Sequence, residues 1–156
     1  MLLKLETLQT PMKLVFELSE ELRHDPQRVK LTQALTQNKD KPRMGLKGNH
    51  GLFGSPEWWA NIQDEKMKVE RVSGTITRTY FAGQDSHGND NSFDLKLENG
   101  TILQSGIYVN HKQDRHLFRK GAFVAIAYAL DELKQQPAAN GDVNYSRIVI
   151  ELAIST

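Results

Sequence analysis

Five segments with strand character follow one another between Val69 and the end of the chain, and this succession most constrains the possible folds. Alternation of apolar and polar residues is typical of half-buried strands. The segments are Val72–Phe81, Ser92–Leu97, Thr101–Val109, Ala122–Leu130 and Tyr145–Ile154. Asn99-Gly100 is a strong hairpin signal, and Gly74 and Gly106 predict bends inside strands. We expect a mostly β (α+β) fold, either a five-stranded curved antiparallel sheet or a small OB- or SH3-like barrel.

The segment Met1–Leu18 predicts a further pair of strands at the N-terminus. Apolar and charged residues alternate on both sides of a break at Pro11, and Pro is common at turns because its ring fixes φ. The apolar positions are Leu3 and Leu5 before the break, and Leu14, Phe16 and Leu18 after it.

Two short helices are predicted from their start signals. Asp25-Pro26 is typical of a helix start, because Asp caps free N–H groups and Pro suits the first turn. We expect a helix over Pro26–Gln37, with Leu31, Ala34 and Leu35 on one face. Ser55-Pro56 carries the same signal for a second helix. In that helix Trp58 and Ile62 are four residues apart and face the core, whereas Trp59 points about 100° away.

These elements predict one domain, since a length of 156 residues lies within the usual range of about 100–200 per domain. We expect residues 1–37 to form the strand pair and helix, and residues 55–156 to form the short helix and the barrel-like core. Residues 38–54 between them are rich in glycine and lysine and predict a long loop, either functional or a linker.

Composition excludes several classes of function. The chain has no Cys, which excludes disulfides, thiol catalysis and Cys-ligated metals. Its 20 Lys and Arg residues against 19 Asp and Glu residues argue against a dedicated binder of duplex DNA. No apolar run is long enough for a signal-peptide core or a membrane span, so we expect a cytoplasmic protein with no membrane contact.

No residue pattern predicts catalysis, a metal or a cofactor. The loop Asp85–Asp94 is rich in oxygen ligands, but Gly88 and Lys96 occupy the wrong positions for an EF-hand. His111 and His116 lack a familiar zinc spacing, and the glycine loop Gly45–Gly54 lacks the ending of a P-loop. We expect no enzyme activity, although a cation-dependent enzyme or small-ligand protein at Asp85–Asp94 stays open as an alternative.

The candidate binding residues are aromatic and point to a protein partner. Phe53, Trp58 and Trp59 lie within seven residues at the end of the glycine loop, and Trp is enriched at the energetic centre of interfaces. We expect a non-catalytic, soluble binding protein that acts through another protein. An inhibitor of the immunity or antitoxin type is one concrete form.

A single-stranded nucleic-acid binder is the alternative. Two loop regions each carry a local net charge of +3, and an aromatic side chain beside them could stack on bases. The residues of this alternative are Lys39, Lys41, Arg43, Lys47, Tyr108, Lys112, Arg115, Arg119 and Lys120.

Overall fold

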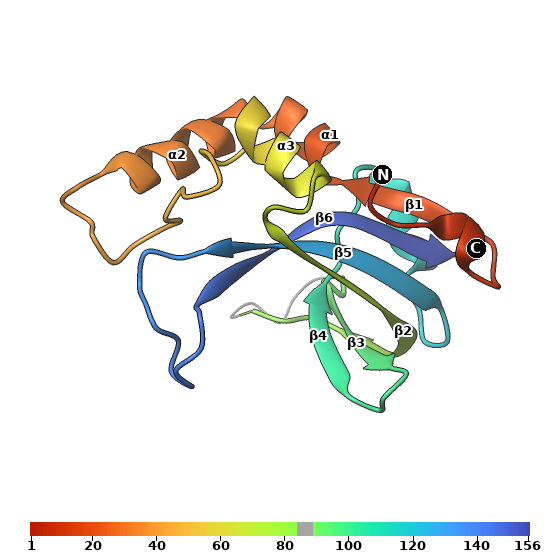
Figure 1. Cartoon of the computed structure of the whole chain (residues 1–156). Helices are drawn as coiled ribbons and strands as arrows, with labels where there is room; N and C mark the ends of the chain where they lie inside the picture. The colour runs from red at the N-terminus through yellow and green to blue at the C-terminus, as the bar shows by residue number, and fades with distance from the viewer. Residues whose placement is uncertain (84–88) are drawn as a thin grey trace. The chain divides into compact units, whose positions relative to one another are not determined.

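The structure, a computed structural model, describes residues 1–83 and 89–156. Six antiparallel strands form one sheet in the order β1-β6-β5-β2-β3-β4 (Figure 1). The strands are β1 (Met12–Glu17), β2 (Lys68–Tyr80), β3 (Ser92–Leu97), β4 (Ile102–Gly106), β5 (Phe123–Glu132) and β6 (Tyr145–Ser155). Among the described residues the sheet is open, with β1 and β4 as its edges. The prediction of an open antiparallel sheet is therefore confirmed, although the sheet has six strands instead of five, and a closed barrel is not formed.

Three α-helices and two 3-10 turns complete the secondary structure that the model describes. The helices are α1 (Leu18–His24), α2 (Pro26–Gln37) and α3 (Pro56–Gln63), and the 3-10 turns are η1 (Leu5–Thr7) and η2 (Lys112–Leu117). The bounds of α2 agree with those predicted from Asp25-Pro26, and Asp25 accepts a hydrogen bond from the Arg28 N–H. Ser55 caps α3 in the same way, through the Trp58 N–H. The helix α1 was not predicted.

The chain divides into two compact units, and it passes from one to the other within β2, β5 and β6. Unit 1 comprises Met1–Glu17, Arg71–Ala127 and Ile150–Thr156, and unit 2 comprises Leu18–Glu70 and Tyr128–Val149. Folding of the whole chain as a single domain stays a prediction.

Unit 1 contains the Asn99-Gly100 turn and the interior glycine Gly74, both of which the sequence analysis singled out. β3 and β4 are joined at Asn99-Gly100, where Gly100 has a φ of +87°. Gly74 lies opposite Leu97, and a Cβ at this position would lie 2.3 Å from the Lys96 carbonyl oxygen. The interior glycine of β2 thus permits a close approach of two backbones.

The prediction of two N-terminal strands is wrong for the first of the two. Leu5–Thr7 is a 3-10 turn, and only β1 forms a strand in this region, where it pairs with β6 as the sixth strand of the sheet. The physical reason is Glu151 on β6, whose buried carboxylate accepts the N–H groups of Leu2 and Leu3 at 2.8–3.0 Å. These groups therefore have a partner without a neighbouring strand.

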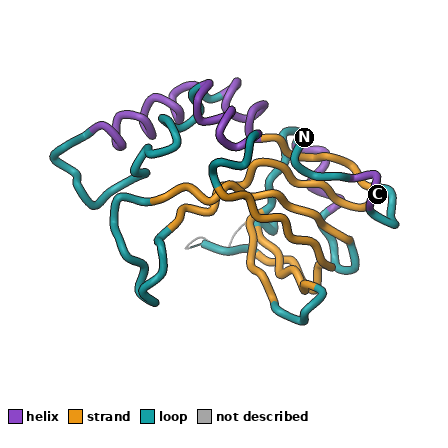
Figure 2. The backbone as a smooth tube through the Cα atoms, viewed as in Figure 1, coloured by secondary structure: helices purple, strands orange, loops and turns teal. Residues whose placement is uncertain are grey.

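Unit 2 contains the three helices, the loop 38–54 and the paired ends of β5 and β6. Figure 2 shows the loop that joins these two strand ends. β5 continues to Glu132, past the predicted end of this strand at Leu130. The backbone beyond Leu130 is paired: the Lys47 N–H donates to the Glu132 carbonyl, and the Leu133 N–H donates to the Asn144 carbonyl.

Candidate partner-binding surface

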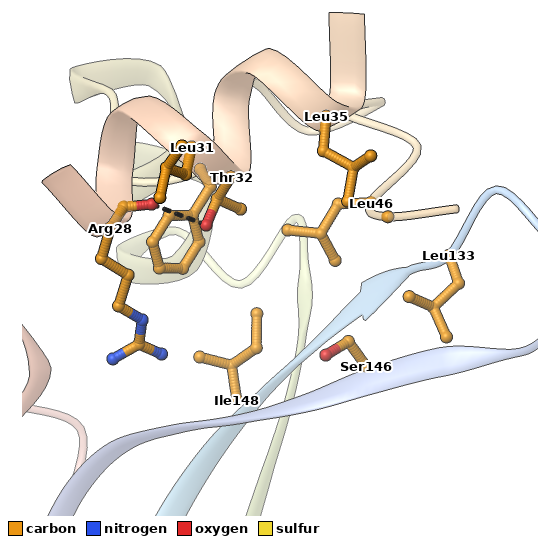
Figure 3. A pocket seen from close by; sticks show the side chains of 10 residues that line it. Arg28, Leu31, Thr32, Leu35, Leu46, Leu133, Ser146 and Ile148 are labelled. Carbon is orange, nitrogen blue, oxygen red and sulfur yellow. Dashed lines mark hydrogen bonds between the residues drawn. The ribbon is translucent and has the colours of Figure 1, made fainter. Parts of the chain in front are cut away.

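An open groove of about 370 Å³ lies between α2 and the ends of β5 and β6, wholly within unit 2. Figure 3 shows Leu31 and Leu35 of α2 on one side and Ser146 and Ile148 of β6 on the other, with Arg28 at one end. The remaining lining residues are Thr32, Gly45, Leu46, Phe53 and Leu133. Most of the lining is apolar, which is typical of a surface that binds another apolar group.

The groove exists because α2 does not bury its apolar residues. No residue of α2 is buried, and Leu31 is 62% exposed. On the predicted apolar face, Leu31 and Ala34 are exposed and Leu35 is half-buried, so this face does not join the core. The helix sequence mixes Gln and Thr with its few apolar residues, so it lacks the continuous apolar stripe that would seat it on a sheet.

Polar contacts hold α2 in place without filling the groove. The Lys134 ammonium group donates to the carbonyl oxygens of Leu35, Asn38 and Lys41 at 2.7, 3.2 and 2.9 Å. A cation at this position satisfies the free carbonyls at the C-terminal end of a helix and interacts favourably with the helix dipole. Gln33 adds a hydrogen bond of 2.9 Å to the Phe53 carbonyl.

The loop after α2 closes one end of the groove. Leu46 is bridged to Leu133, and the Lys134 N–H donates to the Gly45 carbonyl at 3.0 Å. Gly45 has a φ of +88°, and a Cβ there would lie 2.8 Å from Leu35 Cγ. Glycine at this position thus allows the loop to pass beside α2. The predicted long loop 38–54 is correct, and this part of it is paired with the end of β5.

The segment that contains α2 and the loop after it is strongly basic, and its Arg28 lines the groove. The segment Pro26–Lys47 carries six Lys or Arg residues and one acid, a formal net charge of +5. The six are Arg28, Lys30, Lys39, Lys41, Arg43 and Lys47, and all are exposed. Among the described residues, only Lys47 of this set has an ion-pair partner, Glu132 at 3.9 Å. The uncompensated charge makes this surface attractive to an acidic partner.

The aromatic residues predicted to bind a partner form a cluster beside the groove. Phe53 and Trp58 have ring centroids 4.9 Å apart, and Trp58 and Trp59 are also 4.9 Å apart. Phe53 and Trp58 are buried, the latter at 0% exposure, whereas Trp59 is half-buried. The prediction that Trp58 and Ile62 face the core is confirmed. Of the three aromatic residues, Trp59 alone offers appreciable surface to a partner.

A buried carboxylate lies behind this cluster. Asp131 is fully buried, and its Oδ2 accepts the indole N–H of Trp58 at 2.9 Å. Burial raises the pKa of Asp131, while the Trp58 hydrogen bond and the nearby His50 act in the opposite direction. Asp131 Oδ1 and His50 Nδ1 are buried without a hydrogen-bond partner among the described residues. Asp131 therefore fixes the indole of Trp58 from inside unit 2.

A comparison with protein families decides the class of this protein. The family model for immunity protein RhsI2 matches residues 12–155, from the first strand to the last. The chain belongs to the RhsI2 immunity-protein family. It is an immunity-type inhibitor that acts through a protein partner, which is the form of binding protein named in the sequence analysis. No curated protein matches the chain.

The residues of the nucleic-acid alternative are divided between the two units of this RhsI2-family chain. Lys39, Lys41, Arg43 and Lys47 belong to unit 2. The others belong to unit 1, namely Tyr108, Lys112, Arg115, Arg119 and Lys120. Neither unit alone carries the complete set, and the family match gives this alternative no support.

The predicted oxygen-rich loop lies partly outside the described residues, because Asp85 and its neighbours up to Gly88 are among those not described. Of the remainder, Asp90 accepts a hydrogen bond from Thr79, and Asp94 pairs with Arg78 at 2.7 Å. Within residues 1–83 and 89–156, no cluster of three or more His, Asp or Glu residues has the arrangement of a metal site. In the same ranges no helix is long and apolar enough to cross a membrane.

The groove itself was missed by the sequence interpretation. Its signal is a helix with good caps but without a continuous apolar stripe, followed by a basic loop. Each of these features has an ordinary explanation alone, and only the three-dimensional arrangement places Ser146 and Ile148 opposite Leu31.

Proposed function

We propose that this RhsI2-family chain is a non-catalytic cytoplasmic protein that neutralises a toxin by holding it in a stoichiometric complex. The family match carries the proposal, because immunity proteins protect the cell through a toxin partner. The structure supports a binding mode of action through one feature: unit 2 offers an apolar groove beside the half-buried Trp59. Apolar surface of this kind is the usual centre of a protein interface.

Phe53, Trp58 and Trp59 remain the proposed anchor of that interface. Trp59 supplies the contact surface, while Phe53 and Trp58 support it from behind through their ring contacts. Trp59→Ala should therefore weaken toxin binding more than it weakens folding. Phe53 also lines the groove, so the anchor and the groove are parts of one surface of unit 2.

The toxin is identified first by a genetic selection. Fragments of the source genome are expressed in cells with and without this chain, and the toxin is the fragment that kills only in its absence. The purified toxin domain is then mixed with the chain, and the complex is measured by size-exclusion chromatography with light scattering.

A titration separates binding from catalysis. If the chain acts by occupying the toxin, residual toxin activity should fall linearly and reach its minimum at a fixed whole-number molar ratio. Full protection at a small fraction of the toxin concentration would show that one chain inactivates many toxin molecules, which would overturn the non-catalytic proposal. Fractionation of the source cells, with detection of the native chain, tests the cytoplasmic location.

A further inference from the structure

We propose that the groove under α2 receives an acidic segment of the toxin with at least one large apolar side chain. The inference rests on the proposed function for the existence of a toxin complex. It adds the place of contact and the chemistry of the segment that fits there.

The apolar part of the inference comes from the size and lining of the groove. A cavity of about 150 Å³ already holds a benzene-sized group, and this groove measures about 370 Å³. Leu31 and Leu35 on one side face Ile148 on the other, and Leu31 remains 62% exposed. An occupant that covers Leu31 would remove this apolar surface from water, which favours binding.

The acidic part comes from Arg28 in the lining of the groove and from the net positive charge of the segment that contains α2 and the following loop. Arg28 lines one end, where its guanidinium lies 5.6 Å from the centre of the Phe53 ring. No carboxylate of the described residues forms an ion pair with Arg28. In the sequence, the loop after α2 adds Lys39, Lys41 and Arg43 against Asp40 alone. Carboxylates of a partner match this surface, because arginine binds them with two parallel hydrogen bonds and the net charge steers them inward.

Rigidity of the groove favours a preformed docking site. Lys134 holds the C-terminal end of α2, Asp25 caps its N-terminal end, and Gln33 attaches its middle to the Phe53 carbonyl. Lys134 and Gln33 therefore attach the helix to other parts of unit 2 at two places, while Leu31 stays exposed. A fixed groove binds with a smaller loss of conformational entropy than a loop that must be ordered.

The test compares substitutions that change the occupant's fit while preserving the fold. Leu31→Glu and Leu31→Lys both remove the apolar contact and both keep a good helix former at an exposed position. They differ only in the sign of the charge that they introduce. Ser146→Phe fills the groove from β6, where aromatic residues are well tolerated. Ile102→Glu, Ile102→Lys and Thr75→Phe, all at exposed positions of unit 1, are the matched controls.

The measurement is the dissociation constant of each purified variant with the toxin domain at 50 and 300 mM NaCl. We expect Leu31→Lys and Ser146→Phe to weaken binding about tenfold or more, since the buried apolar contact is lost. Leu31→Glu should bind at least about tenfold more weakly than Leu31→Lys at 50 mM NaCl, with a smaller difference at 300 mM because salt screens charge. The unit 1 controls should stay within about twofold of the unsubstituted chain. Thermal unfolding of every variant verifies folding.

Three other results would overturn the proposal. If all groove variants bind like the unsubstituted chain, the toxin docks elsewhere although the immunity function stands. Equal losses for Leu31→Glu and Leu31→Lys would show that the occupant is not acidic. A dimer of the chain alone that Ser146→Phe dissociates would assign the groove to a second copy. If the unsubstituted chain forms no complex with any toxin, the proposed function itself is overturned. A loss of binding in the groove variants alone would leave the proposed function intact.

Discussion

The ammonium nitrogen of Lys134 lies 2.7 Å from the carbonyl oxygen of Leu35, in the last turn of α2. The same group reaches two further carbonyls in the loop that follows the helix. One side chain just past β5 thus fixes both the end of α2 and the beginning of the loop 38–54. The groove keeps its shape because this contact holds the helix from the side.

Lys134→Met should loosen α2. Methionine keeps most of the length of the side chain but removes the donor, so three carbonyls lose a charge-assisted hydrogen bond. We expect a loss of about 1–3 kcal/mol in the free energy of unfolding in urea, and faster hydrogen exchange of the α2 amides. Lys39→Met, at an exposed position, is the control and should cost no more than about 0.5 kcal/mol. Equal exchange rates in the two variants would contradict this role for Lys134.

Trp58→Phe should destabilise the chain more than Trp59→Phe, although the two residues are neighbours. Phenylalanine lacks the indole N–H, so the buried Asp131 loses the hydrogen bond it accepts from Trp58. We expect a cost of about 1–3 kcal/mol in addition to the lost ring contact. Trp59 is half-buried, and the same substitution there removes no hydrogen bond to Asp131. Chemical denaturation of both variants measures the difference in stability. Similar midpoints of unfolding would show that the hydrogen bond from the Trp58 indole to Asp131 contributes little to stability.

Glu151→Gln should release the N-terminal segment of unit 1. Glutamine replaces one acceptor oxygen by a donor, which then faces the N–H groups of Leu2 and Leu3. We expect a loss of about 1–3 kcal/mol in stability and faster proteolysis near residue 5. Glu98→Gln, at an exposed position between β3 and β4, serves as the control. An unchanged cleavage rate would mean that the buried Leu2 and Leu3 hold this segment without the carboxylate.

The sequence predicted those helices and strands whose ends depend on contacts between neighbouring residues. Asp25-Pro26 fixed the start of α2, Ser55 capped α3, and the four-residue spacing of Trp58 and Ile62 predicted which side of α3 is buried. The strand Ser92–Leu97 has the predicted bounds because its alternation ends at a two-residue turn. Caps, turns and periodicity depend on a few neighbouring residues, so the sequence is sufficient to predict them.

The failures involve contacts between distant residues. The C-terminal end of α2 is held by Lys134, which is 99 residues away from its partner Leu35. The absence of a strand at Leu3 depends on Glu151, 148 residues away. β5 also extends past its predicted end at Leu130, because the Glu132 carbonyl accepts the Lys47 N–H from a distant part of the chain. The candidate site could not be predicted for the same reason, because its two sides come from α2 and β6.

Asp131 predicts a specific dependence of stability on pH. Its pKa in the folded chain is raised by burial, whereas an unfolded aspartate has a pKa of about 3.9. Between these two values the folded state retains a proton that the unfolded state has lost. Stability due to this group therefore falls as the pH rises through that window, and the penalty is complete above the folded pKa.

Asp131→Asn removes this titration and keeps an oxygen that can accept the Trp58 indole N–H. The free energy of unfolding of Asp131→Asn relative to the unsubstituted chain should rise with pH from about pH 4 and level off above the folded pKa. His50 and Glu132, the charged groups that act on Asp131, are present in both proteins, so the difference between the two curves reports on Asp131. Urea unfolding at intervals from pH 4 to pH 8 measures it, with the exposed Asp142→Asn as control. A constant difference across this range would show that Asp131 has the same pKa in the folded and unfolded chain.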